Sequence, residues 1–417
     1  MANQPRMLEG YRVLDFTQFV AGPTCTRLLA EMGAEVIKLE LAPSGDRVRG
    51  GGLKSQKPEH KDSSHSTYYL QHNHSKLSLA IDLKKPGARE VVMAMLPSID
   101  VVVENFAPHV IDRLGFSYED IKKVNPKIIM CSISMAGQTG PLSYKAGYDF
   151  IGQSYAGVTD GIGEADGAPA MTTMAIGDVS TGVAAAMAIG FALVHRERTG
   201  EGQYLDASLL DTYFHMHELS VPIVSMRPGK WAPKRTGAMH PTGAPCGVFQ
   251  AKDGFVFIVI QQHEIGRLWK AMGRPELATD PRFLTNRDRM KNNAALKEII
   301  ETWLATFPDR DSAVAELDKV RVPCAPVYKL AESMAHPHMR GRKTVRQVKD
   351  PRLGDLEIPG MPVKFSNWPD KTDLKASKLG ADNEAVLNEM LGLSSDQIAK
   401  LYADGVLLRA PEVQTAV

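Results

Sequence analysis

The sequence predicts an α/β protein with a large domain on a parallel, Rossmann-like sheet and a smaller α+β domain. Short apolar strands alternate with helices over roughly the first third of the chain, which is typical of a parallel sheet covered by helices. The chain has 417 residues, 43% hydrophobic and 23% charged. That is an ordinary composition for a globular protein, and the length favours two domains over one continuous core.

The amino-terminal third begins with a β-α-β unit. Residues 11–16 alternate as a strand does, residues 24–32 fit a helix, and residues 34–40 (Ala-Glu-Val-Ile-Lys-Leu-Glu) form a second apolar strand. Further strands and helices are expected in alternation at 77–82, 86–96, 100–104 and 127–134. Pro86 suits the first turn of its helix.

The rest of the chain is expected to be mainly helical, with one strand. Predicted helices occupy 179–195, 205–220, 263–272, 293–306 and 311–319, with a strand at 255–260 and two short helices within 385–405. The segment from Arg227 to Pro245 is rich in proline, glycine and basic residues and marks a boundary. We therefore expect a large domain over 1–228, a small domain over 229–330, and a segment over 331–417 that returns to the large domain.

Charge and cysteine content exclude several classes of protein. Lys plus Arg total 49 against 48 Asp plus Glu, so no overall field favours nucleic acid or an anionic membrane. The four cysteines lie far apart without a Cys-x-x-Cys pair, which argues against a disulfide framework or a thiolate zinc site. No apolar signal core or long apolar run is evident, and we expect a cytoplasmic protein.

Asp178 is the most informative single residue, because it is the only charged side chain between Ala168 and Ala192. An unpaired carboxylate in apolar surroundings loses hydration, so it usually has a structural or a chemical task. We expect Asp178 to be the N-cap of the helix that begins at Val179. A helix N-terminus also stabilises negative charge, so capping and catalysis are both compatible with this position.

The motifs give little support for a dinucleotide-binding site or a metal site. The Gly-rich run from Gly161 to Gly167 lacks the spacing of a dinucleotide-binding loop, which argues against an NAD enzyme. Three His-x-His pairs have no companion ligands, so no metal site is predicted. The pairs are His72 and His74, His215 and His217, and His336 and His338.

The remaining motifs are spread along nearly the whole chain, and together they resemble the class III CoA-transferase family (CaiB/BaiF), which includes formyl-CoA transferase and α-methylacyl-CoA racemase. The matching segments are Leu8 to Thr17, Ala21-Gly22-Pro23, Gly33 to Glu40, Ser44-Gly45-Asp46, Asn73 to Lys76, Glu104-Asn105-Phe106, Asp112 to Phe116, Asn125-Pro126, Thr199 to Gln203, Asp253-Gly254 and Val322-Pro323-Cys324.

The resemblance implies a covalent mechanism on Asp178. In the transferases of this family the matching aspartate attacks an acyl-CoA thioester and passes through an anhydride and an aspartyl-CoA thioester. It also implies an interlocked homodimer and no tightly bound cofactor, with acyl-CoA and a carboxylic acid as substrates. The implied CoA-binding residues are Gln18, Phe19, Val20 and Ala21 at the thiol end, and Asn73, Lys76, Asn105, Phe106 and Arg113 near the nucleotide.

Departures from the family narrow the reaction. Tyr148 stands where a racemase has its catalytic histidine, and a tyrosine is a poor base at neutral pH. Asp149 matches an acidic residue that supports the transferase site, although a capping role is equally open. Val20 and Leu41 replace a glutamine and a CoA-contacting arginine of formyl-CoA transferase, and Thr236 to Gly243 lacks its run of four glycines. These changes favour an acceptor bulkier than oxalate.

Three residues are predicted to line the substrate pocket. Tyr148, Met239 and His240 are plausible lining residues, and backbone N–H groups near Gly177 or in the segment 237–243 would suit an anionic intermediate. Two alternatives stay open at this point. One is a 2-methylacyl-CoA racemase of the same fold, and the other is a non-catalytic acyl-CoA-binding protein.

Overall fold

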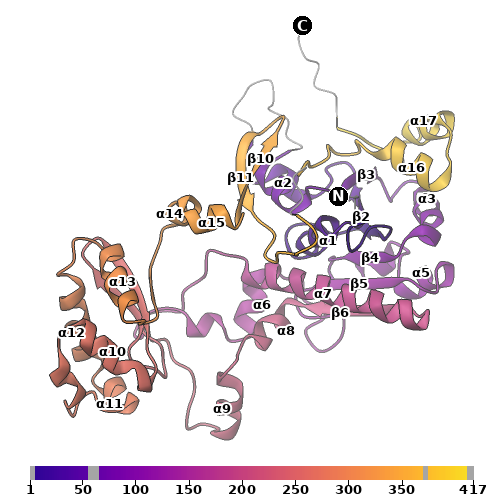
Figure 1. Cartoon of the computed structure of the whole chain (residues 1–417). Coiled ribbons are helices and arrows are strands. Elements are labelled where there is room, and N and C mark those ends of the chain that lie inside the picture. Colours follow the sequence, from indigo (N-terminus) through magenta and orange to yellow (C-terminus); the bar gives the residue numbers. More distant parts are fainter. Residues whose placement is uncertain (1–4, 55–64, 370–373, 411–417) are drawn as a thin grey trace. The chain divides into compact units, whose positions relative to one another are not determined.

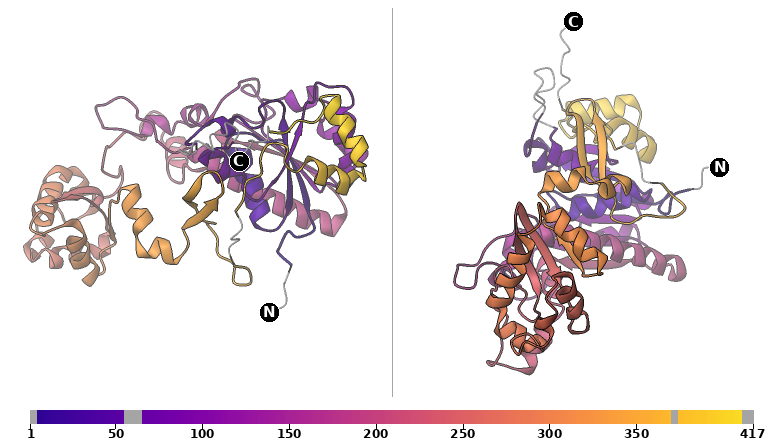
Figure 2. Two further views of the ribbon diagram at one scale, coloured as in Figure 1. Left: turned by 90° about the horizontal axis from the view of Figure 1, so that it is seen from above. Right: turned by 60° about the vertical axis from the view of Figure 1, so that its left-hand side comes forward.

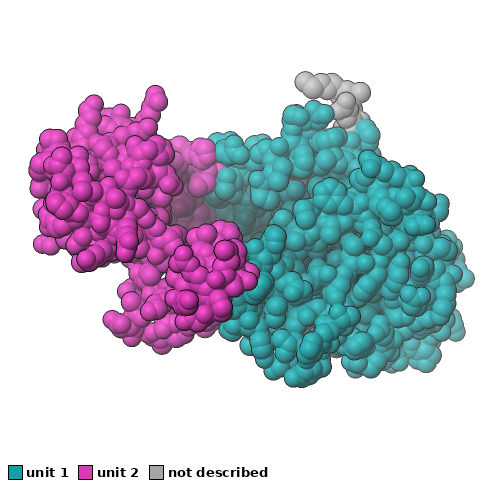
Figure 3. All heavy atoms as spheres, turned by 90° about the horizontal axis from the view of Figure 1, so that it is seen from below, with its two compact units in different colours: residues 1–157, 172–217, 340–417 teal, residues 158–171, 218–339 magenta. Residues whose placement is uncertain are grey.

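A computed structural model describes residues 5–54, 65–369 and 374–410 of the chain (Figure 1). The chain forms two compact units, coloured separately in Figure 3. Unit 1 comprises residues 1–157, 172–217 and 340–417, and unit 2 comprises 158–171 and 218–339. Compared with the predicted small domain over 229–330, the smaller unit also includes residues 158–171, 218–228 and 331–339.

Unit 1 is built on a six-stranded parallel sheet, in agreement with the predicted α/β class. The strand order is β3-β2-β1-β4-β5-β6. The strands are β1 (Arg12–Asp15), β2 (Glu35–Leu41), β3 (Leu77–Ile81), β4 (Val101–Glu104), β5 (Ile129–Ser134) and β6 (Gln203–Ser208). The order reverses between β1 and β4, and in such sheets ligands bind beyond the carboxyl ends of the strands at that point.

Helices cover both faces of this sheet (Figure 2). On one face, Val13 and Val103 pack against α1 (Ala21–Glu31) and α7 (Ile176–Thr199). On the other, Leu14 and Val102 pack against α3 (Ala88–Met95), α5 (Tyr118–Val124), α16 (Asn383–Leu391) and α17 (Ser395–Ala403). The strands are therefore apolar on both sides, which explains why they read as short continuous apolar runs.

The predicted helix over 205–220 is wrong in its first part, which is strand β6. Gly202 lets the chain enter the sheet beside β5, because a Cβ atom there would lie 2.1 Å from the Ile128 carbonyl oxygen. The strand ends at Ser208, whose hydroxyl accepts a hydrogen bond from the Asp211 N–H and so caps the short helix α8 (Leu209–His215).

The other elements of unit 1 are short. They are α2 (Thr67–Asn73), α4 (Val110–Arg113), α6 (Asp149–Tyr155) and the antiparallel hairpin β10 (Val345–Asp350) and β11 (Gly354–Pro359). The hairpin is absent from the sequence prediction.

Unit 2 has a three-stranded antiparallel sheet of β7 (Cys246–Ala251), β8 (Gly254–Val259) and β9 (Cys324–Pro326). Four of its helices pack around a separate apolar core that includes Trp269, Phe283 and Leu296. They are α10 (Ile265–Ala271), α11 (Asn286–Lys291), α12 (Asn293–Leu304) and α13 (Arg310–Lys319). The helices α9 (Ser220–Met226) and α14 (Leu330–Ala335) have no buried residue, and α15 (Pro337–Gly341) follows at the return to unit 1.

Helix α7 is long and apolar enough to cross a membrane by length and composition alone. Its packing in unit 1 gives it another role, because Ala185, Ile189 and Ala192 are buried against α1 and the sheet. It is a core helix of unit 1.

Candidate active site

The loop from β1 to α1 lies at the point where the strand order reverses. Asp15 ends β1, and the residues that follow it, Gln18 to Ala21, reach the start of α1. Asn105 and Phe106 come directly after β4, the neighbouring strand. Two segments predicted separately to contact CoA are therefore brought together at one edge of the sheet.

Asp178 reaches the same place because α7 packs closely against α1. Gly182, one helical turn after Asp178, lies so near α1 that a Cβ atom would be 2.5 Å from the Ala21 carbonyl oxygen. Gly177 likewise leaves room for Tyr213, whose ring would be 2.1 Å from a Cβ atom there. The two glycines allow the start of α7 to sit tightly between α1 and Tyr213.

The predicted N-cap role of Asp178 is wrong. Helix α7 begins at Ile176, so Asp178 is its third residue. The capping carboxylate is Asp149 from α6, whose Oδ2 accepts the Asp178 N–H at 2.8 Å. The Tyr213 hydroxyl donates to the other oxygen of Asp149 at 2.5 Å. A carboxylate from another helix thus satisfies the helix N-terminus, a contact that local sequence does not reveal.

This arrangement leaves the Asp178 carboxylate without a hydrogen-bonding or cationic partner among the residues that the structure describes. Burial, and then the nearby charge of Asp149, raise the pKa of Asp178 to about 7. Both effects favour the neutral acid, because burial removes water and a neighbouring carboxylate repels a second negative charge. The half-buried side chain is therefore weakly solvated, and its protonated and ionised forms are both populated near pH 7.

Asp178 opens into a cavity of about 450 Å³. Of the predicted CoA-binding and pocket residues, those that line it are Gln18, Phe19, Val20, Ala21, Asn105, Phe106 and Tyr148. The sequence prediction missed two basic residues of the lining, Arg47 and Lys145. Both would have been found by searching for cations near these motifs, since Arg47 follows Asp46 and Lys145 precedes Tyr148.

Lys76 and Asn73 do not line this cavity. Lys76 is buried, and its ammonium donates to Asp15 at 3.0 Å, to Asn73 at 2.9 Å and to Thr26 at 2.7 Å. These contacts tie α1 to the end of β1, which gives both residues a structural role in the chain. Arg113 lies in α4 with an exposed side chain, also outside the lining.

Tyr148 is 62% exposed, and its ring meets that of Phe19 edge-on at a centroid distance of 5.7 Å. Met239 and His240 belong to unit 2, where the backbone of Met239 bridges to Gly247 and the His240 N–H donates to the Cys246 carbonyl oxygen. Their assignment to the substrate pocket remains a prediction.

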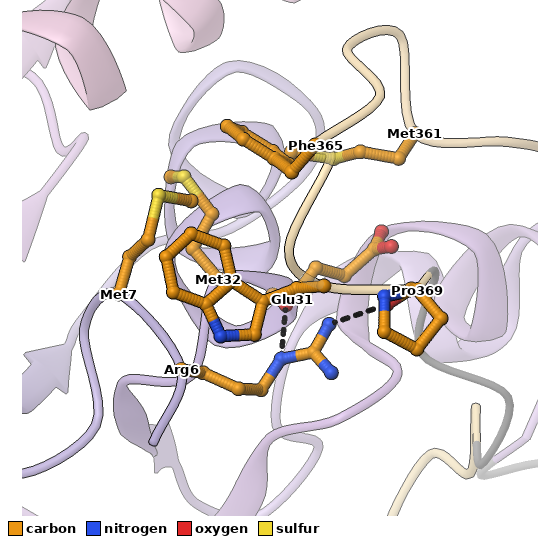
Figure 4. Close-up of a pocket in the computed structure, with 8 residues that line it drawn as sticks. Arg6, Met7, Glu31, Met32, Met361, Phe365 and Pro369 are labelled. Atoms are coloured by element: carbon orange, nitrogen blue, oxygen red, sulfur yellow. Dashed lines mark hydrogen bonds between the residues drawn. The ribbon is translucent and has the colours of Figure 1, made fainter. Parts of the chain in front are cut away.

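A second hollow, shown in Figure 4, is too small for a substrate. It has a volume of about 20 Å³, room for about one water molecule. In it, Arg6 donates hydrogen bonds to the Glu31 and Pro369 carbonyl oxygens. This contact joins the amino-terminal segment to α1 and the chain before residue 370.

The sequence matches a protein family and several known CoA-transferases. Residues 8–383 match CoA-transferase family III. The chain is 33% identical to succinyl-CoA–D-citramalate CoA-transferase of Chloroflexus aurantiacus, over 97% of this chain and 98% of that protein. It is 38% identical to acetyl-CoA:oxalate CoA-transferase of Acetobacter aceti, over 91% and 95% of the two chains. A CAIB/BAIF family protein from Brucella suis has a similar structure, with a TM-score of 0.79, 33% identity, and coverage of 93% of this chain and 100% of that one.

The chain therefore belongs to CoA-transferase family III. It is an enzyme of the class III CoA-transferase type, which uses acyl-CoA as a substrate.

Proposed function

We propose that this enzyme moves CoA from an acyl-CoA to a carboxylic acid through covalent intermediates on Asp178. A carboxylate oxygen attacks the thioester carbonyl carbon, the C–S bond breaks, and CoA leaves as a thiolate with a mixed anhydride on Asp178. The thiolate then attacks the aspartyl carbonyl and expels the donor acid, leaving an aspartyl-CoA thioester. The acceptor acid repeats these steps in reverse, and Asp178 is regenerated without net proton transfer.

The observation that carries this proposal is the placement of an unpaired carboxylate on the wall of a large cavity. An anionic nucleophile that lacks hydrogen bonds and a cation keeps its electron pair available for attack. Asp149 supports it by fixing the Asp178 backbone through the N–H bond, while Tyr213 holds Asp149. Asp149 is therefore proposed as a supporting residue.

The racemase alternative requires a histidine, and none is found among the described residues that line this cavity. Tyr148 lies where a racemase has a histidine and packs against Phe19. A tyrosine is ill suited to remove a Cα proton at neutral pH. The non-catalytic alternative would leave the half-buried, weakly solvated carboxylate of Asp178 without a use.

For the acceptor, we propose a dicarboxylic acid bulkier than oxalate. Val20 and Leu41 make part of the cavity lining apolar, and Arg47 and Lys145 place two cations on its wall. A cation can hold the second carboxylate of a substrate while the first reacts. The relatives named above act on citramalate and oxalate, both dicarboxylic acids. We place the reaction in the cytoplasm on the sequence grounds given above.

The test of the nucleophile is Asp178→Asn. We expect loss of at least about 1,000-fold in transfer with succinyl-CoA or acetyl-CoA as donor, with free CoA still bound. In wild type, quenching during turnover should leave a CoA or acyl adduct on the peptide that contains Asp178, detected by mass spectrometry. Asp211→Asn is the matched control, because Asp211 is also the third residue of a helix and is exposed. Near-normal turnover of Asp178→Asn would refute the assignment.

We also propose a homodimer. Val183, Met187, Phe191 and Val194 are exposed along one side of α7, and a second copy of the chain would remove this apolar stripe from water. The homodimer implied by the family supplies such a partner. Light scattering after gel filtration should give about twice the mass of one chain, and a monomer at concentrations where the enzyme is active would contradict the proposal.

A further inference from the structure

The loop between β1 and α1 has an unusual density of side-chain hydrogen bonds to its backbone. Asp15 accepts the Thr17 N–H at 2.8 Å, and the buried Lys38 ammonium donates to the Thr17 carbonyl oxygen at 2.6 Å. Asp46, which is paired with Lys38 at 2.9 Å, accepts the Phe19 N–H at 3.2 Å. The chain around Gln18 is therefore fixed from several sides by groups that lie below the cavity.

Asn105 completes this arrangement by forming hydrogen bonds with the backbone N–H and the backbone carbonyl oxygen of Gln18. Its amide oxygen accepts the Gln18 N–H at 2.7 Å, and its amide nitrogen donates to the Gln18 carbonyl oxygen at 2.7 Å. The neighbouring Gly22 is required for the fit, since a Cβ atom there would lie 2.4 Å from Thr17 and 3.1 Å from the Asn105 carboxamide. Both ends of the carboxamide are thus used within the protein.

The next residue, Phe19, adopts a left-handed backbone conformation with φ 66°. This conformation is unfavourable for a residue with a large side chain and persists only where surrounding contacts impose it. It turns the Phe19 ring onto Tyr148, edge to face, at 5.7 Å. Phe19 and Tyr148 both line the cavity that contains Asp178.

From these contacts we propose that Asn105 is a positioning residue, which holds the Gln18–Phe19 peptide in its strained form so that the Phe19 ring forms a fixed wall beside Asp178. This inference rests on the proposed function of Asp178. It adds to the predicted role of Asn105 as a nucleotide contact, because one donor and one acceptor of its carboxamide bind Gln18. The purpose of such a wall is to keep a bound thioester within reach of the carboxylate, since small displacements of a reacting group reduce rates strongly.

The first experiment compares Asn105→Ala with Asn125→Ala. Asn125 is a matched control, because its side chain also makes hydrogen bonds to the backbone, donating to the Leu96 and Ile99 carbonyl oxygens, and it does not line the Asp178 cavity. We expect Asn105→Ala to lower kcat with succinyl-CoA by about 10- to 100-fold, with the Kd of free CoA changed less than about threefold. Asn125→Ala should leave kcat within about twofold, whatever its effect on Tm. A higher Kd with unchanged kcat in Asn105→Ala would leave only the nucleotide contact and overturn the positioning role.

The second experiment tests the strained backbone and does not depend on Asn105→Ala being folded. Phe19→Gly and Phe19→Ala both remove the ring, but only glycine adopts a positive φ without strain. We expect a Tm for Phe19→Gly at least equal to that of Phe19→Ala, the reverse of the usual order of these residues. A clearly lower Tm for the glycine variant would overturn the strained conformation.

The two proposals can fail separately. If wild type forms no adduct on Asp178 with either donor, the proposed function fails, while the Tm order of the Phe19 variants still tests the imposed backbone conformation. If wild type forms the adduct and Asn105→Ala forms it at the same rate, the positioning role alone is refuted.

Discussion

Two aspartates at the carboxyl edge of the same sheet illustrate how neighbours decide the state of a carboxylate. Asp15 is fully buried, and burial raises its pKa. The ammonium groups of Lys76 and Lys38 together outweigh this effect, so the pKa lies below its usual value. Asp178 is less buried and has no such cation, and its pKa rises to about 7. Paired carboxylates hold the fold here, whereas the unpaired one is available for chemistry.

A third carboxylate shows that a raised pKa alone does not identify a nucleophile. Burial also raises the pKa of Glu104 to about 7. Its Oε2 accepts the Phe106 N–H at 2.8 Å, and it does not line the cavity. Of the carboxylates that the structure describes, Asp178 alone combines the raised pKa with access to the cavity.

The largest expected change in stability comes from removing the ammonium group beside Asp15. Lys76→Met leaves a buried carboxylate without its direct partner, which typically costs about 3 to 5 kcal/mol in the free energy of unfolding. Urea unfolding at pH 7 should show this loss. Lys127→Met is the control, because Lys127 is exposed, and its midpoint should stay close to wild type. A Lys76→Met protein as stable as the control would show that the ion pair does not hold the fold.

A smaller effect is expected from removing the support of Asp178. Asp149→Ala leaves the N-terminus of α7 uncapped, so we expect a loss of about 1 kcal/mol in stability and of about tenfold or more in kcat. Asp149→Asn retains an acceptor for the Asp178 N–H, and stability and kcat should largely recover. Equal kcat values for wild type and Asp149→Ala would remove Asp149 from the site.

The subtlest test uses pH alone. Only the ionised form of Asp178 attacks, and its raised pKa means that protonation begins near neutral pH. We therefore expect kcat/KM to be constant above about pH 8 and to fall about tenfold per pH unit below pH 6. Asp149→Asn should shift this fall to lower pH, because it removes the second cause of the raised pKa. A wild-type profile that remains flat to pH 5 would contradict the environment described for Asp178.

The fold was predictable where burial on both faces imposes apolar strands, as in β1, β2 and β4. The prediction failed at β6, because residues 203–208 form a partly exposed edge strand with mixed composition. It also failed at the hairpin β10–β11, whose strands are partly exposed and mixed in composition too. Apolar patterning carries little information in strands with one exposed side, whereas the edge strand β3 is buried and was predicted.

In the site, the isolation of Asp178 and its place near the start of a helix were visible in the sequence, and its place in a cavity comes from the structure. The capping bond from Asp149 was not visible in the sequence, because it joins residues 29 positions apart through their tertiary packing. The ion pair of Lys76 was not visible either, because its partner Asp15 lies 61 positions away. Partners of buried charges are set by the fold.

The close approach of Gly182 to the Ala21 carbonyl oxygen limits which residues position 182 can hold. One hydrogen atom in place of a methyl group fixes the separation of the two helices, and Asp178 lies one turn along from that point. A side chain at 182 would collide with the backbone of α1, so α7 and the Asp178 that it carries would have to shift. A residue outside the cavity lining therefore helps to set the position of the carboxylate.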